Sequence, residues 1–97
     1  MPTYIMLLKW TEEGIKTVKD VPKRVELARN TFKSVGGNIK DFYFVFGKYD
    51  MIAIAEAPSD EAIAKAVLAI GSRGAANIQT LKAFTEAEGI AIIKGLP

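Results

Sequence analysis

The chain has 97 residues, of which 49% are hydrophobic and 25% are charged, and its 13 basic and 11 acidic side chains give a formal net charge of +2. This length is typical of one small domain with a single core, so residues 1–97 are expected to form one domain. The chain contains no cysteine and no histidine. That composition excludes disulfides, thiol catalysis and imidazole catalysis, and it removes the usual ligands of zinc, copper and haem iron. We therefore expect no cofactor and no metal site.

The amino-terminal segment has no basic leader and no small-residue cleavage site, so we expect no signal peptide. A membrane span needs about 20 apolar residues. Every apolar run is interrupted before that length by a charged side chain: Lys9, Lys40, Asp50, Glu56 or Lys82. The sequence therefore predicts a cytoplasmic protein with no membrane partner.

Charge is unevenly distributed along the chain. Residues 1–48 carry 9 basic and 5 acidic side chains, whereas residues 49–97 carry 4 and 6. The basic excess lies between residues 16 and 33, where acidic residues are interspersed. This mixture favours a solvated helix face over a nucleic-acid-binding surface.

Residues 3–10 predict the first strand, because their apolar side chains occupy odd and even positions alike, as in a strand buried on both faces. Thr11, followed by two acidic residues, starts a helix, and Asp20-Val21-Pro22 starts a second one. Apolar residues then recur every three or four positions until Gly36-Gly37, where the helix is expected to end. They are Val21, Val25, Ala28, Phe32 and Val35.

Residues 39–46 and 51–57 are predicted to form a β-hairpin in which Gly47 adopts a positive φ. Odd positions of the first strand then lie beside even positions of the second. One face carries Phe42, Phe44, Phe46, Met51, Ala53 and Ala55, and the other carries Asp41, Tyr43, Val45, Asp50, Ile52, Ile54 and Glu56. Large rings opposite alanines leave room for helices, so we expect the phenylalanine face to form the core.

Residues 58–61 cap a second main helix, whose apolar stripe is Ile63, Ala66, Val67 and Ile70. A fourth strand is expected at residues 77–84. Thr85 and Glu88 have the spacing of a capping box, which predicts a short terminal helix that Gly89 weakens.

The order of these elements is βαββαβ followed by a short C-terminal helix. Right-handed crossovers then give an α+β, ferredoxin-like fold, with a four-stranded antiparallel sheet and both main helices on one face. The other face would expose Tyr43, Val45, Ile52 and Ile54 together with apolar residues of the first strand, a larger apolar patch than a stable monomer shows. Two sheets packed face to face in a homodimer would cover it.

Five segments together resemble the GYD domain family over essentially the whole chain: Trp10-Thr11-Glu12-Glu13-Gly14-Ile15, Asp41-Phe42-Tyr43, Gly47-Lys48-Tyr49-Asp50, Glu56-Ala57-Pro58 and Ala83-Phe84-Thr85. In the namesake motif, Lys48 stands between Gly47 and Tyr49. The resemblance implies a ferredoxin-like subunit whose sheets pair in a dimeric α+β barrel. It implies no reaction, because the wider barrel group includes enzymes and ligand-binding regulatory domains alike.

Glu56 and Tyr43 are the candidate catalytic residues, since both are assigned to the mixed face of the hairpin. Partial burial of Glu56 would raise its pKa enough for acid or base catalysis. A structural role is favoured, in which this strand-end acid is solvated or paired with Lys40, Lys48 or Lys82. Tyr43 could donate a hydrogen bond to a ligand or serve as an interface aromatic, and the interface role is favoured.

Other candidate ligand-binding residues are Tyr49, Asp50 and Lys82. A structural role in the hairpin is favoured for Tyr49 and Asp50, because an aspartate there readily accepts backbone N–H bonds. Lys82 and Arg73 could hold an anion, although lone cations are usually solvated. Trp10 could line the rim of a pocket or pack under the first helix.

The Phe-Tyr-Phe run at residues 42–44 is on the second strand, whereas an RNA-binding domain carries its aromatic motif on the third. We therefore expect no nucleic-acid partner. The carboxylates Asp41, Asp50 and Glu56 have no spacing that specifies a cation. The first hypothesis is a homo-oligomer that binds, or transforms, a small apolar molecule in a dimeric barrel. The alternative is a non-catalytic regulatory or structural oligomerisation module.

Overall fold

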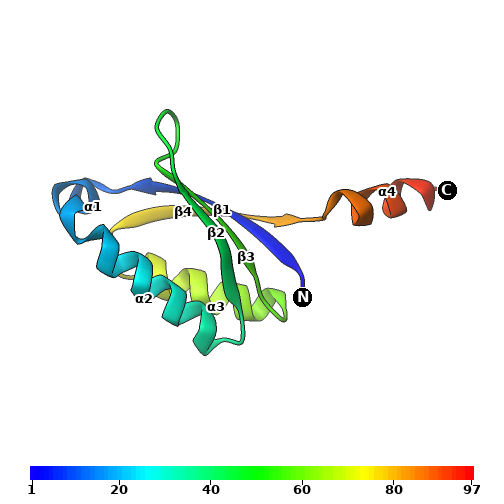
Figure 1. Ribbon diagram of the computed structural model, residues 1–97, viewed down its shortest axis with the longest axis horizontal. Coiled ribbons are helices and arrows are strands. Elements are labelled where there is room, and N and C mark those ends of the chain that lie inside the picture. The colour runs from blue at the N-terminus through cyan, green and yellow to red at the C-terminus, as the bar shows by residue number, and fades with distance from the viewer.

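A computed structural model describes residues 1–97 (Figure 1). In chain order the elements are β1 (Thr3–Trp10), α1 (Glu12–Lys16), the 3-10 helix η1 (Val18–Asp20), α2 (Val21–Ser34), β2 (Asn38–Phe44), β3 (Met51–Glu56), α3 (Asp60–Gly71), β4 (Ala76–Ala83) and α4 (Glu86–Lys94). The predicted order of strands and helices is therefore confirmed. None of the helices has the length and apolarity that crossing a bilayer requires.

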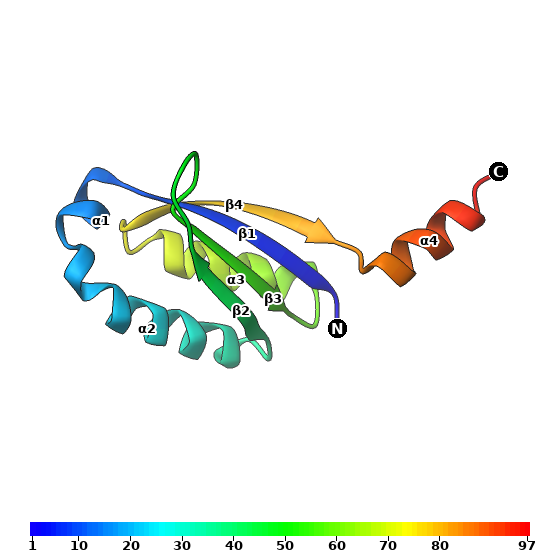
Figure 2. The same ribbon diagram turned by 45° about the horizontal axis from the view of Figure 1, so that its top comes forward.

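The four strands form one antiparallel sheet in the order β2-β3-β1-β4. Helices α2 and α3 lie together on one face of this sheet, and no helix covers the other face (Figures 1 and 2). This arrangement confirms the α+β, ferredoxin-like fold. The two central strands, β1 and β3, come from distant parts of the sequence, so the sheet joins both halves of the chain.

The core lies between the sheet and the two helices. Alternate residues of the central strands point into it: Tyr4, Met6, Leu8, Met51, Ala53 and Ala55, all buried. Because β3 contributes alanines, the helices approach closely, and Phe32 of α2 becomes fully buried. Gly37 lets the chain after α2 pass close to the end of β3, since a Cβ there would lie 2.6 Å from the Glu56 carbonyl oxygen.

Two of the three phenylalanines assigned to the core are not in it. Strand β2 ends at Phe44 rather than at residue 46, and Phe44 and Phe46 are 61% and 100% exposed. Strand β2 lies at the edge of the sheet, and residues 45–50 form the loop between β2 and β3, in which the Val45 N–H donates to the Asp50 carbonyl and the Asp50 N–H donates to the Leu8 carbonyl, both at 2.9 Å. Phe42, opposite Ala53, does pack against the core.

Side-chain caps support the predicted helix starts except at α2, where Asp20 forms no capping bond. Thr11 accepts a hydrogen bond from the Gly14 N–H at 3.0 Å, and Ser59 accepts one from the Ala62 N–H at 3.1 Å. Thr85 and Glu88 form the reciprocal capping box that their spacing predicts.

Gly47 has a φ of 129°, in agreement with its predicted role in the hairpin. That value lies in a region of backbone conformation that residues with a side chain rarely adopt, so glycine suits this turn.

Helix α4 extends away from the body of the molecule, beyond the end of β4 (Figures 1 and 2). It has no buried residue. Its apolar side chains Ile90, Ile92 and Ile93 are exposed, as is Leu96 just after it. A helix of nine residues that buries none of its apolar side chains is marginal in water, so α4 lacks a packing partner within this chain.

Candidate functional site

One face of the sheet carries no helix, and we call it the open face. Six side chains on it are apolar or aromatic and define it: Ile5, Leu7, Tyr43, Ile52, Ile54 and Leu81. Ile5 lies between Ile54 and Leu81 on its neighbouring strands, and Leu7 lies opposite Ile52. Tyr43 and Leu81 are 55% and 41% exposed. The register settles which residues of β1 lie here, because Tyr4, Met6 and Leu8 all point to the helices.

Tyr43 and Glu56 both lie on this side of the sheet, as the predicted register requires. Tyr43 lies on the edge strand β2, opposite Ile52, and Glu56 is half-buried at the end of β3, opposite Asn38 and Thr3. Glu56 forms no ion pair, so of the two structural alternatives the pairing with a lysine is not seen. Four residues of strand place Tyr43 and Glu56 about 13 Å apart. Within one chain they therefore cannot act on the same atom of a small substrate.

The hairpin loop is tied to the sheet by Tyr49 and Asp50. The Tyr49 hydroxyl donates to Oε1 of Gln79 at 2.8 Å, which anchors the loop on β4. The Asp50 carboxylate accepts a hydrogen bond from the backbone N–H of Trp10 at 2.9 Å. Both side chains thus hold the loop in place, in line with the structural role favoured from sequence.

Lys82 lies on the helix-covered side of the sheet, away from Glu56, because β4 pairs it with Tyr4. Its Nζ is 3.2 Å from Oδ1 of Asp60 at the start of α3, and the Tyr4 hydroxyl donates to the same oxygen at 2.5 Å. Burial, together with the Asp60 carboxylate, raises the pKa of Tyr4 to about 12. The hydrogen bonds from Tyr4 and Lys82 lower the pKa of Asp60. The structure therefore separates Lys82 from the other candidate residues.

The three carboxylates considered as cation ligands also lie apart. Asp41 and Glu56 are on the side of the open face, whereas Asp50 bonds to the end of β1. No group of three or more acidic side chains converges anywhere in the chain.

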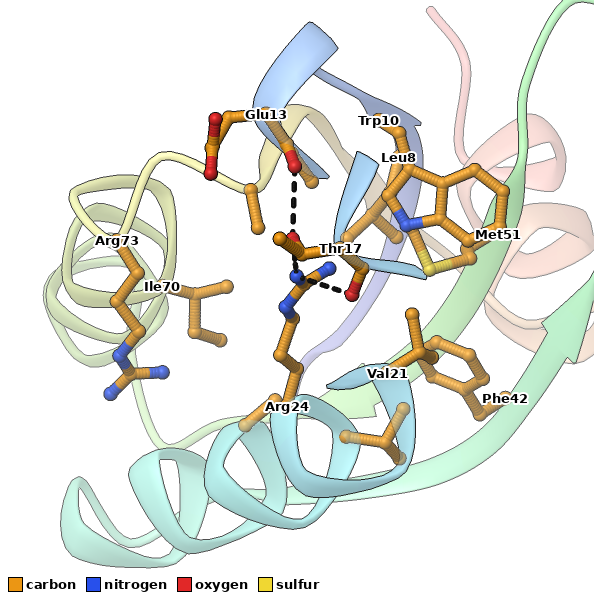
Figure 3. Close-up of a pocket in the computed structure, with 14 residues that line it drawn as sticks. Leu8, Trp10, Glu13, Thr17, Val21, Arg24, Phe42, Met51, Ile70 and Arg73 are labelled. Atoms are coloured by element: carbon orange, nitrogen blue, oxygen red, sulfur yellow. Dashed lines mark hydrogen bonds between the residues drawn. The ribbon is translucent and has the colours of Figure 1, made fainter. Parts of the chain in front are cut away.

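A cavity of about 270 Å³ lies between the sheet and the helices, at the end where α1 joins α2 (Figure 3). Its walls come from the end of β1, the first half of α2, and the segment that links α3 to β4. Most of the lining is apolar: Leu8, Trp10, Val21, Val25, Ala28, Phe42, Met51, Ile70, Ala75 and Ala76. Three charged residues, Glu13, Arg24 and Arg73, and one hydroxyl, that of Thr17, complete it.

Arg24 is the half-buried cation of this cavity (Figure 3). It donates to the Gly14 carbonyl at 3.2 Å, to the Thr17 carbonyl at 2.8 Å and to the Thr17 hydroxyl. Arg73 is exposed and donates to the Thr31 hydroxyl at 2.8 Å. Neither arginine forms an ion pair, so both positive charges are bonded only to neutral oxygens.

Trp10 and Arg73 were among the candidate residues predicted from the sequence, and Arg24 was not. The signal was present, because Arg24 lies three residues after Val21 and four before Ala28, on the apolar stripe of α2. A cation on that stripe has to reach past apolar neighbours to its partners. Here it reaches the carbonyl groups at the end of α1.

The chain is thus a small α+β domain with two notable features, an uncovered sheet face and a cavity beneath the sheet. Residues 4–93 match the model of the GYD domain, and the chain belongs to the GYD domain family.

The chain is also 34% identical over 95 residues to a protein of Thermus thermophilus named "Glutamine synthetase and cystathionine beta-lyase binding protein". That match covers 97% of this chain and 100% of the relative.

Two solved structures have a similar fold. The crystal structure of FFRP-DM1 has a TM-score of 0.61 and 19% sequence identity, and the match covers 87% of this chain and 100% of that one. The crystal structure of TTHA0845 from Thermus thermophilus has a TM-score of 0.55 and 23% identity, over 87% of this chain and 94% of that one. At these identities the likeness concerns the fold alone.

Proposed function

We propose that this chain is a non-catalytic binding protein whose partners are enzymes of the kind named for its Thermus relative. The observation that carries the proposal is the match to that protein over nearly the full length of both chains. The candidate catalytic residues support it as well, since Tyr43 and Glu56 lie too far apart for joint chemistry in one chain. This favours the second of the two hypotheses drawn from the sequence, a regulatory or structural module.

The unit that binds is proposed to be a homodimer paired through the open face. In a single chain, the four open-face residues of the central strands are aliphatic and half-buried, whereas Tyr43 and Leu81 are exposed. A standard interface buries about 800 Å² on each partner, which one face of a four-stranded sheet can supply. The exposed isoleucines of α4 would pack on the second copy in the same dimer. The cytoplasmic location expected from the sequence stays a prediction.

Direct titration tests the enzyme-binding proposal. The purified chain is added to glutamine synthetase and, separately, to cystathionine beta-lyase from the same organism, and complex formation is followed by sedimentation velocity. We expect at least one enzyme to sediment faster, with a dissociation constant of about 10 μM or tighter, which corresponds to about −7 kcal/mol. No complex with either enzyme at about 100 μM chain would contradict the proposal.

The first hypothesis, binding of a small apolar molecule between paired sheets, is the second candidate. The observation that favours it is the position of Tyr43 and Glu56 on the apolar side that would line such a barrel. A neutral fluorescent probe, N-phenyl-1-naphthylamine, tests it. If the barrel binds such molecules, Tyr43→Ala should weaken binding of the probe about tenfold. Phe44→Ala, which removes an exposed ring from the opposite side of β2, should not weaken it. Equal binding by both variants would argue against the barrel site.

A further inference from the structure

We propose that the cavity beneath the sheet is a binding site for a small monocarboxylate with a hydrophobic body. The proposal goes beyond the function given above, because it needs neither a second copy nor an enzyme partner. It rests on three features of the cavity: its unfilled apolar volume, the half-buried Arg24, and the position of Trp10.

The volume is the first argument. Small-molecule sites in proteins are concave, mostly apolar pockets that are largely formed before the ligand binds. The cavity here is about 270 Å³, which is close to the lower end of small-molecule pockets. Small side chains, among them Ala28, Ala75 and Ala76, leave it open, and ten of its fourteen lining residues are hydrophobic. An apolar group is therefore the chemistry that fits most of its wall.

Arg24 supplies the polar end of the site. A guanidinium group has five N–H donors, and the three hydrogen bonds of Arg24 go to neutral oxygens of Gly14 and Thr17. Donors therefore remain for a ligand, and the positive charge has no carboxylate partner. A charge-assisted bond to a carboxylate is about twice as strong as a neutral hydrogen bond, so a carboxylate is the complementary group.

The other charges restrict the ligand further. Arg73 adds a second cation at the exposed side of the cavity, which reinforces the preference for an anion. Glu13 lines the same cavity and pairs with neither arginine. Its negative charge disfavours a second anionic group on the ligand. A monocarboxylate therefore fits better than a phosphate or a dicarboxylate.

Trp10 gives both a contact and a readout. It lies beside Met51 on the sheet side of the cavity (Figure 3). Its indole offers a flat apolar surface on which an aromatic ring of the ligand can stack. It is also the only tryptophan in the chain, so its fluorescence reports occupancy of this cavity.

The first experiment uses the unmodified protein and three probes of one shape: 3-phenylpropionate, 3-phenylpropanamide and 3-phenylpropylamine. Binding is measured by quenching of Trp10 fluorescence and by calorimetry. We expect the carboxylate to bind at least about tenfold more tightly than the amide, as a hydrogen bond to a charged group implies, and the amine to bind least. No binding of the carboxylate at about 10 mM, or equal binding of carboxylate and amide, would overturn the proposal.

Two variants then locate the site. Arg24→Gln is expected to reduce the preference for carboxylate over amide to about threefold or less, whereas Arg29→Gln leaves it unchanged, because Arg29 donates to the Ile39 carbonyl outside the cavity. Ala28→Leu fills the cavity and leaves Arg24 in place. It is expected to weaken the binding of all three probes about tenfold or more. Its result does not depend on whether the Arg24 variant folds. Binding to Ala28→Leu as tight as to the unmodified protein would overturn the proposal.

Discussion

Gly14 is buried where α1 passes over the link between α3 and β4, and the close contact there depends on its having no side chain. A Cβ at this position would lie 1.9 Å from the Ala75 carbonyl oxygen. That carbonyl also accepts a hydrogen bond from the Thr11 N–H at 3.1 Å, so it cannot move away without losing the contact that holds α1.

We therefore expect Gly14→Ala to lower the free energy of unfolding by about 3 kcal/mol, as overpacking against fixed backbone does. The matched change Gly89→Ala should instead raise it by up to about 1 kcal/mol, because Gly89 is inside α4 and nothing lies within 4 Å of its added Cβ. Urea unfolding of both variants measures this. A Gly14→Ala protein as stable as the unmodified one would show that the α1 contact is not tight.

Asp60 gives stability a dependence on pH. The hydrogen bonds from Tyr4 and Lys82 lower its pKa in the folded state below the ordinary value of 3.8. A group whose pKa is lowered by folding stabilises the folded protein above its unfolded pKa, and that contribution disappears as the pH falls through the folded value.

Asp60→Asn should therefore be less stable than the unmodified protein at pH 7, and the difference should shrink toward pH 2. Asp41→Asn is the control, since Asp41 forms no ion pair and accepts no side-chain hydrogen bond. Unfolding by urea at both pH values measures the difference. A difference for Asp60→Asn that is the same at pH 7 and pH 2 would contradict the role assigned to this carboxylate.

Among the elements, α4 is the one whose apolar side chains find no packing partner within the chain. Its capping box fixes the start, yet its three isoleucines face solvent. If these side chains pack on a second copy, amide exchange in residues 86–94 should slow as protein concentration rises from about 1 to about 200 μM. The amides of β1 serve as the internal control, because the sheet protects them in either state. Exchange in α4 that is fast at both concentrations would rule out this packing.

The strands and helices could be predicted well because their causes are local. The short loop around Gly47 predicted the hairpin of β2 and β3, capping residues located α3 and α4, and the spacing of apolar residues located α2. The exposure of Phe44 at the end of β2 could not be predicted, because it depends on the place of β2 at the edge of the sheet, and strand order is set by contacts between distant parts of the sequence. The irregularity in register between Ile39 and Asp41 was not predicted either.

The candidate site was predicted less well than the fold. Tyr43 and Glu56 were assigned to the correct side of the sheet, since that follows from the hairpin register alone. The position of Lys82 depends on how β4 pairs with β1, and that pairing brings it to Asp60 instead. The cavity was not predicted, because it arises where α1, α2 and the α3–β4 link meet, and no local pattern describes an unfilled volume.

In the assembly that we propose for the whole molecule, two copies pair through the open face. Ile54 lies near the middle of that face, between Ile5 on β1 and Asp41 on β2. Ile54→Lys would place an unpaired charge in the dimer interface, which costs several kcal/mol of association free energy. Leu68→Lys is the matched control, because Leu68 is 73% exposed on α3, away from the open face.

Sedimentation velocity at about 10 μM, applied to the unmodified protein and to both variants, distinguishes a dimer from a single chain. We expect a particle of twice the 10.6 kDa of one chain for the unmodified protein and for Leu68→Lys, and a particle of 10.6 kDa for Ile54→Lys. An unmodified protein that sediments as a single chain, or an Ile54→Lys variant that stays dimeric, would contradict the proposed assembly.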